Sequence, residues 1–260
     1  MEMKIKQITI ACLLLFTQSS FAQNTRFATQ GVIEFEKRVN MYALIKEQVK
    51  RNPTRSYYVQ AEEDYQKKNP QFKILKSSLT FSKEQTLFKP TSEELITNNF
   101  FDFETSHQNN IIATNTAAAT SIAQKKVFDE TYLLSDSTRK INWKITDEFR
   151  NIAGYDCRRA NALIMDSIYV VAFYTDEIPV SGGPEAFTGL PGMILGVALP
   201  YEHVTWFATA VTDTPVTDEK QLKAPTKGKP VNSKQLSTML KAATKDWGEW
   251  GQDALKAFLL

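Results

Sequence analysis

The sequence predicts a mainly β protein of the α+β type: a single curved antiparallel sheet or half-barrel with a C-terminal amphipathic helix packed against it. Three observations lead to this fold class. Apolar and polar residues alternate with a period of two along several stretches, which is typical of half-buried strands. Turn-forming residues separate many of these stretches. Near the C-terminus the apolar residues recur at every third or fourth position instead, as on one face of a helix.

The predicted strands follow one another along most of the chain. Ile33, Phe35 and Val39 alternate with charged residues, and residues 72–81 form a second strand-like stretch. We expect residues 127–134 and 141–149 to pair as an antiparallel hairpin across a Ser-Asp-Ser turn. The remaining strands are expected after the Ala153-Gly154 turn, at residues 155–164, 167–174, 192–199 and 203–211.

Other stretches lack this alternation. Residues 47–70 are charged and predict a short helix around 58–67, whereas the polar residues 91–124 predict a long surface excursion. Residues 213–230 hold three prolines and predict a linker-like loop. The C-terminal helix is expected over 233–259, with Ser233 as its N-cap and two glycines, at 248 and 251, that can kink or split it.

The N-terminus has the pattern of a secretory signal peptide over residues 1–22. Two lysines precede a short apolar run, and Ser20-Phe21-Ala22 supplies small residues at the cleavage site. Residues 23–260 then form a single domain. The apolar run is shorter than the roughly 20 residues of a spanning helix, so no transmembrane segment is expected after cleavage. Cleavage removes Cys12 and leaves Cys157 as a solitary, buried thiol.

Composition and missing motifs exclude several function classes. The 31 Lys and Arg residues nearly balance the 29 Asp and Glu residues, so nucleic acid is not an expected partner. Only 2 Cys and 2 His are present, which excludes a disulfide scaffold and a Cys/His-rich zinc site. No nucleophile elbow, phosphate-binding loop, metalloprotease helix or dinucleotide fingerprint occurs. We therefore predict no catalytic residue, metal or cofactor.

The glycine-rich segment at residues 181–195 is the most informative part of the sequence. Pro191-Gly192 has the signature of a type II turn with Gly192 at positive φ, and Phe187 and Leu190 can turn inward. Two interpretations stay open, a loop that contacts a ligand and a structured loop that plugs the end of the sheet. The candidate residues are Pro184, Phe187, Gly189, Leu190, Pro191 and Gly192.

Gly189-Leu190-Pro191-Gly192-Met193-Ile194 resembles the signature of the GLPGLI family, uncharacterised secreted proteins common in Bacteroidota. Met193 replaces the leucine of that signature, a conservative change. Residues 143–148, 154–160 and 172–179 resemble three further segments of the family in the same order. The resemblance implies an exported protein of a Gram-negative envelope, in the periplasm or associated with the outer membrane. It implies no established activity and no catalytic residues.

The expected function is therefore non-enzymatic. A curved sheet offers a concave face that can bind an apolar, lipid or peptide ligand, or an outer-membrane protein partner. One alternative is an assembly component of outer-membrane machinery. Another is a hydrolase that uses Cys157 or Ser181 as nucleophile and His203 as base, which requires the nucleophile and the base to lie within hydrogen-bond reach.

Overall fold

The computed structural model describes residues 27–91 and 100–260, so the predicted signal peptide lies outside the described residues. Within them, twelve strands form one open sheet in the order β12-β6-β5-β4-β3-β2-β1-β11-β10-β9-β8-β7. The ordered strands are β1 (Gly31–Asn40), β2 (Phe72–Phe81), β3 (Gln85–Pro90), β4 (Ile111–Asn115), β5 (Thr120–Val127), β6 (Glu130–Ser137), β7 (Lys144–Ile152), β8 (Tyr155–Ile164), β9 (Ile168–Thr175), β10 (Met193–Leu199), β11 (Val204–Thr212) and β12 (Lys229–Val231).

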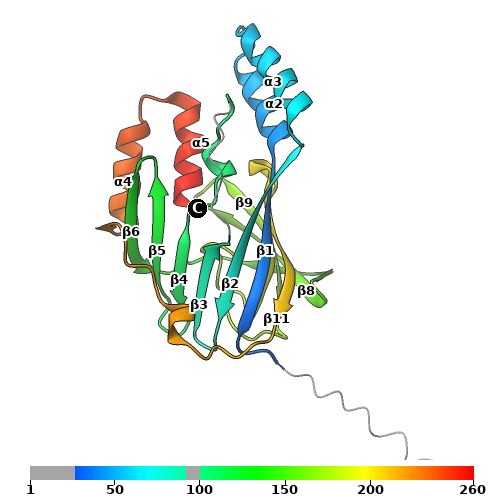
Figure 1. The fold of residues 1–260 in the computed structure, drawn as a ribbon, viewed down its shortest axis with the longest axis vertical. Coiled ribbons are helices and arrows are strands. Elements are labelled where there is room, and N and C mark those ends of the chain that lie inside the picture. The colour runs from blue at the N-terminus through cyan, green and yellow to red at the C-terminus, as the bar shows by residue number, and fades with distance from the viewer. Residues whose placement is uncertain (1–26, 92–99) are drawn as a thin grey trace, which may run out of the picture.

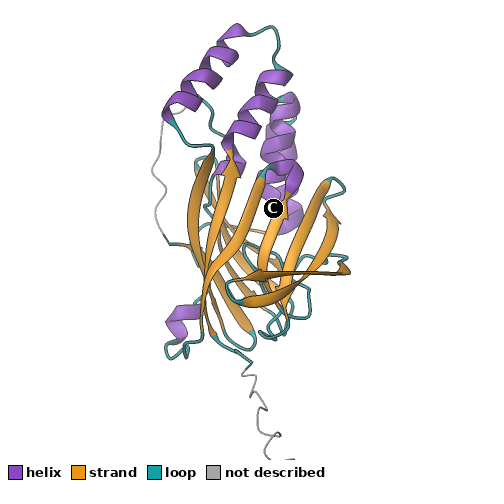
Figure 2. Cartoon of the chain, turned by 90° about the vertical axis from the view of Figure 1, so that its right-hand side faces the viewer, coloured by secondary structure: helices purple, strands orange, loops and turns teal. Residues whose placement is uncertain are grey.

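The mainly β class is confirmed, with one refinement. The sheet is mixed, because β12 runs parallel to β6 while the other neighbours are antiparallel. Viewed from the side, the sheet curves around its interior and the α-helices gather at one end of it (Figure 2). β7 and β12 lie at the two ends of the strand order and do not pair with each other.

The predicted hairpin between residues 127–134 and 141–149 is wrong. β6 and β7 lie at opposite ends of the sheet, and β6 pairs instead with β5 through a tight turn at Phe128 and Asp129. Phe128 adopts a φ of 53°, the left-handed conformation that such a turn requires. The predicted surface excursion at 91–124 is also wrong in part, because it contains β4 and the first half of β5.

Two helices, α2 (Met41–Arg51) and α3 (Ser56–Lys68), are inserted between β1 and β2. They stand above the ends of these strands (Figure 1), and β1 pairs with β2 along its whole length, from Gly31 to Asn40. Met41 and Ile45 are buried and anchor α2 on the core. The sequence predicted a single short helix here, because the exposed polar face of α2 conceals its apolar anchor.

The C-terminal helix is split, as its glycines allowed. α4 (Ser233–Thr244) and α5 (Gly248–Leu259) lie beside β4, β5 and β6 (Figure 1). The N-cap of α4 is Asn232 rather than Ser233, since the Asn232 side chain accepts from the amide of Gln235, and the Gln235 side chain accepts from the amide of Asn232. Short 3-10 turns complete the fold: η2 (Glu104–Ser106), η3 (Pro200–Glu202) and η4 (Glu219–Leu222).

The main core lies on the concave side of the sheet. Large apolar side chains from β1, β2 and β3, such as Phe35, Phe81 and Phe88, are buried there. The loop between β9 and β10 inserts four more, Ile178, Val180, Phe187 and Leu190. A second hydrophobic cluster forms where α4 and α5 meet β5, and it comprises Val127, Leu236, Leu240, Ala254 and Phe258.

Candidate functional site

The glycine-rich loop fills the concave side of the sheet instead of lining an open ligand cavity. Pro184, Phe187, Leu190 and Gly192 are buried, whereas Gly189 and Pro191 are exposed. Trp143 Nε1 donates a hydrogen bond to the carbonyl of Thr188 at 2.9 Å. The amide of Gly189 donates to Ser181 Oγ at 3.0 Å. The loop is therefore held both by its apolar side chains and by polar contacts.

The predicted type II turn at Pro191-Gly192 is wrong, because Gly192 is not among the residues at positive φ. Gly189 adopts that conformation, with a φ of 93°. Glycine is still required at 192 for another reason. A Cβ atom there would lie 2.1 Å from the carbonyl oxygen of Thr175, at the end of β9. The loop and the end of β9 pass too close together for any side chain.

The three residues of the hydrolase alternative have separate surroundings. Cys157 is buried in β8, and burial is the largest cause that raises the pKa of its thiol to about 12, which disfavours the thiolate. Ser181 Oγ accepts the Gly189 amide. His203 Nε2 lies 2.8 Å from Glu47 Oε1 on α2. Among the described residues, none of these contacts joins Cys157 or Ser181 to His203.

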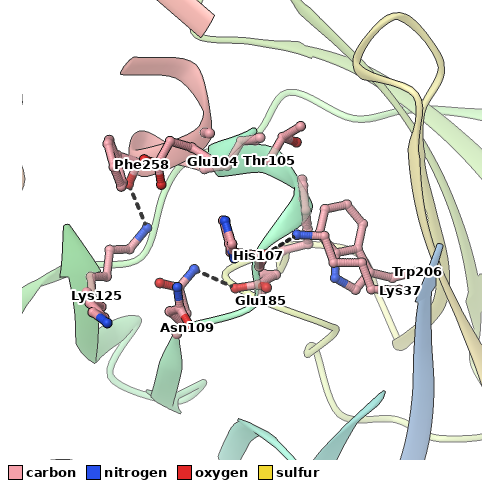
Figure 3. A pocket seen from close by; sticks show the side chains of 14 residues that line it. Lys37, Glu104, Thr105, His107, Asn109, Lys125, Glu185, Trp206 and Phe258 are labelled. Atoms are coloured by element: carbon pink, nitrogen blue, oxygen red, sulfur yellow. Dashed lines mark hydrogen bonds between the residues drawn. The ribbon is translucent and has the colours of Figure 1, made fainter. Parts of the chain in front are cut away.

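A polar cavity of about 50 Å³ lies inside the fold, between the sheet and the end of α5. Lys37 on β1 and Lys125 on β5 are only 4% and 5% exposed. Their side chains reach into the cavity from opposite sides, with Glu185 between them (Figure 3). Lys37 Nζ donates to the carbonyl of His107 at 2.6 Å, and Lys125 Nζ donates to the carbonyl of Phe258 at 3.1 Å.

Glu185 belongs to the glycine-rich loop and is 6% exposed. Its Oε2 atom accepts a hydrogen bond from Asn110 Nδ2 at 2.9 Å. Its φ of 51° lies in the left-handed region that non-glycine residues rarely adopt. Burial lowers the pKa of Lys125 to about 8, and the nearby Glu185 opposes part of that shift. Burial also raises the pKa of Glu104 on the cavity wall.

An open groove of about 650 Å³ lies between the α2–α3 pair, residues 100–103 and the start of α5. We call it the aromatic groove, since half of the side chains that line it are aromatic. Its lining residues are Gln48, Arg51, Asn52, Arg55, Tyr58, Phe100, Phe101, Asp102, Phe103, Trp247, Glu249 and Trp250. Phe100 is 59% exposed and Trp250 is 45% exposed, so large apolar groups face solvent together in this groove, and a contiguous exposed apolar patch is typical of an interaction site.

The aromatic side chains of this groove contact one another. The ring of Tyr58 lies 5.4 Å from that of Phe100 and 6.2 Å from that of Phe101, and the rings of Trp247 and Trp250 are 5.4 Å apart. Arg51 of α2 crosses the groove to form ion pairs with Glu249 and Asp253 of α5. These ion pairs link the α2 wall of the groove to the α5 wall.

Neither the polar cavity nor the aromatic groove was predicted from the sequence. The sequence did contain a signal for the cavity. Lys37 stands between the inward-facing Phe35 and Val39, and Lys125 stands between the inward-facing Ala123 and Val127, so both lysines are expected to face the interior. A charged residue in an inward-facing row indicates a buried ion pair or a site. The groove had no local signal, because its walls come from three distant segments.

Two specific site types have no candidate in the described residues. In residues 27–91 and 100–260, no three or more His, Cys, Asp or Glu side chains are grouped so as to hold a metal ion. Over the same ranges, no helix combines the length and the apolar character needed to cross a membrane.

Comparison with known proteins gives a short family match. A family model described as "Protein of unknown function (Porph_ging)" matches residues 163–196, from the end of β8 into β10. The matched stretch includes the signature at 189–194 and is consistent with a family of the Bacteroidota type. No curated protein matches the chain.

Solved structures support the fold. Two structures of PNGF-II, in different space groups, are similar to this chain with TM-scores of 0.50 and 0.51 and sequence identities of 19% and 16%. The similarity covers 82% and 81% of this chain but only 33% and 32% of the PNGF-II chains. This chain therefore spans about a third of the length of these structures, and at such low identity the likeness concerns the fold alone.

Proposed function

We propose that this protein is a non-enzymatic binding protein of the GLPGLI family, exported to the cell envelope, that binds a peptide segment of a partner protein in its aromatic groove. The observation that carries the proposal is the gathering of exposed aromatic side chains in one open groove. Trp, Tyr and Arg are the residues that most often dominate binding energy at protein interfaces, and all three line this groove.

The composition of the groove favours a peptide over a lipid tail. Gln48, Asn52 and Arg55 lie among the aromatic residues, and their amide and guanidinium groups can pair with the backbone of a bound peptide. A lipid tail offers no partner for these groups, which would lose their hydration on binding. Large apolar side chains of the peptide would pack on Phe100 and Trp250.

A displayed library of random 12-residue peptides, selected on the folded protein, tests the proposal. We expect the selected peptides to carry two or more large apolar residues. Trp250→Ala should weaken their binding by about tenfold or more, since removing one interface tryptophan typically costs about 2 kcal/mol. Phe149→Ala is the matched control, because Phe149 is 65% exposed but lies on β7, outside the groove.

The outcomes are distinct. Peptides that bind wild type and Trp250→Ala equally well would place binding elsewhere and reject the groove. Sedimentation with vesicles of phosphatidylethanolamine and phosphatidylglycerol tests the lipid alternative in parallel. Vesicle binding that requires Trp250, without any peptide binding, would replace the peptide by a membrane surface.

A further inference from the structure

The buried polar cavity is separate from the aromatic groove in its chemistry, because hydrogen-bond donors dominate its walls. Lys37 and Lys125 each bring an ammonium group with three N–H donors. Trp206 lies beside Lys37 across the β1–β11 pair, and the Lys37 ammonium lies 5.0 Å from the centre of the Trp206 ring. Asn109 and Asn110 add amide groups from the segment after η2.

Beside the two buried lysines, the indole group of Trp206 is a second observation that points to a bound ligand. Its indole N–H is buried and has no hydrogen-bond partner among residues 27–91 and 100–260, and Trp206 lines the cavity. Buried donors without partners are rare, since each costs about 1–3 kcal/mol. A donor of this kind next to two buried ammonium groups indicates that the missing partner is an acceptor with negative charge.

We propose that this cavity binds a small monocarboxylate between the ammonium groups of Lys37 and Lys125 and the indole N–H of Trp206. The cavity volume of about 50 Å³ fits such a ligand. One water needs about 10–15 Å³ of such volume, so the space corresponds to about four waters, and acetate has four non-hydrogen atoms. Exposed Asn109 and Lys126 also line the cavity, so it reaches the surface and an anion can enter.

The charges around the cavity select a single negative charge. Two ammonium groups that are almost fully buried favour an anion. The buried carboxylate of Glu185 lies between them, however, and Glu104 stands on the cavity wall, so a doubly charged ligand such as hydrogen phosphate is repelled more than a monocarboxylate is. Methyl or other apolar substituents of the ligand would face Phe187 and Phe258.

Indole N–H resonances in 1H–15N spectra test the proposal directly. Sodium acetate is titrated at pH 7, with sodium chloride at equal ionic strength as the reference, and the Trp206 signal is assigned with Trp206→Phe. We expect the Trp206 signal to shift and saturate at millimolar acetate, while the signals of Trp247 and Trp250 follow the chloride reference. Acetate affinity should fall above about pH 8, where Lys125 loses its proton.

Three variants and a second anion complete the test. Lys37→Met and Lys125→Met should each weaken acetate binding at least tenfold, whereas Lys89→Met, at an exposed position of β3 outside the cavity, should leave it unchanged. The proposal is overturned if acetate leaves the Trp206 signal at its chloride position, or if the lysine variants bind as wild type does. Binding of phosphate but not of acetate also overturns the carboxylate assignment. If a lysine variant fails to fold, the acetate titration of the wild-type protein still tests the proposal by itself.

Discussion

At the residue scale, Gly192 and Gly154 illustrate two different physical reasons why a position requires glycine. Gly192 has an ordinary φ, but a Cβ atom would lie 2.1 Å from the backbone oxygen of Thr175. Gly154 has a φ of 90° in the β7–β8 turn, and nothing lies within 4 Å of its Cβ position. Overlap between an added Cβ atom and a neighbouring backbone cannot be relieved by a side-chain rotation. An alanine at positive φ, in contrast, carries only a modest strain.

We therefore expect Gly192→Ala to destabilise the protein by about 3 kcal/mol and Gly154→Ala by about 1 kcal/mol. Gly192→Val, with a larger side chain, should cost more than Gly192→Ala. Urea unfolding of the three variants measures these differences. Equal losses for Gly192→Ala and Gly154→Ala would show that the approach to Thr175 relaxes at little cost.

Lys125 makes a pH-dependent contribution to stability whose sign follows from its burial. Its pKa is about 8 in the folded protein and about 10.4 in an unfolded chain, so between these values the unfolded state holds more protons. Stability must then rise with pH across this window, by up to about 3 kcal/mol for this group. The raised pKa of Cys157 acts in the opposite direction, since the folded state disfavours its thiolate.

Comparison with Lys125→Met isolates this contribution, because Cys157 is common to both proteins. Unfolding in urea is measured at pH 7.5 and pH 10, in buffers without carboxylates. The stability of wild type relative to Lys125→Met should increase between the two values. A difference that stays constant would mean that Lys125 keeps an ordinary pKa in the folded protein.

At the scale of elements, the sequence predicted individual strands better than their partners. The predicted stretch 72–81 coincides with β2, and residues 155–164 coincide with β8. Alternation of side chains is a local property, so it is readable from a few residues. Pairing depends on where the chain goes next. After β6 the chain crosses to the far end of the sheet, and the sequence between β6 and β7 has no local pattern that predicts this crossing.

The candidate site was less predictable than the fold, for a similar reason. The helical pattern at the C-terminus places Trp247 and Trp250 on one stripe with Leu236 and Leu240. In the structure the helix breaks between Thr244 and Gly248, so the leucines are buried while both tryptophans remain partly exposed. Their neighbours in the groove come from α2, α3 and residues 100–103, far away in the sequence.

At the scale of the whole molecule, two hydrophobic clusters imply unequal local stability. The main cluster joins β1, β2 and β8–β11 with the inserted loop and contains most of the buried apolar side chains. The second cluster has five buried residues, around Leu236 and Leu240 on α4 and Phe258 on α5. Regions with fewer buried contacts open at lower free energy than the main core. The α4–α5 end should therefore exchange amide hydrogens before β9–β11 do.

Leu240→Ala tests whether the two clusters open separately. Truncating a buried leucine costs about 2–4 kcal/mol, which corresponds to about a hundredfold faster exchange wherever the affected unit opens on its own. We expect that acceleration in α4, α5 and β5–β6, with little change in β9–β11. Met239→Ala is the control, since Met239 precedes Leu240 on α4 but is largely exposed. Uniform acceleration across all strands would instead show that the sheet and the C-terminal helices unfold as one cooperative unit.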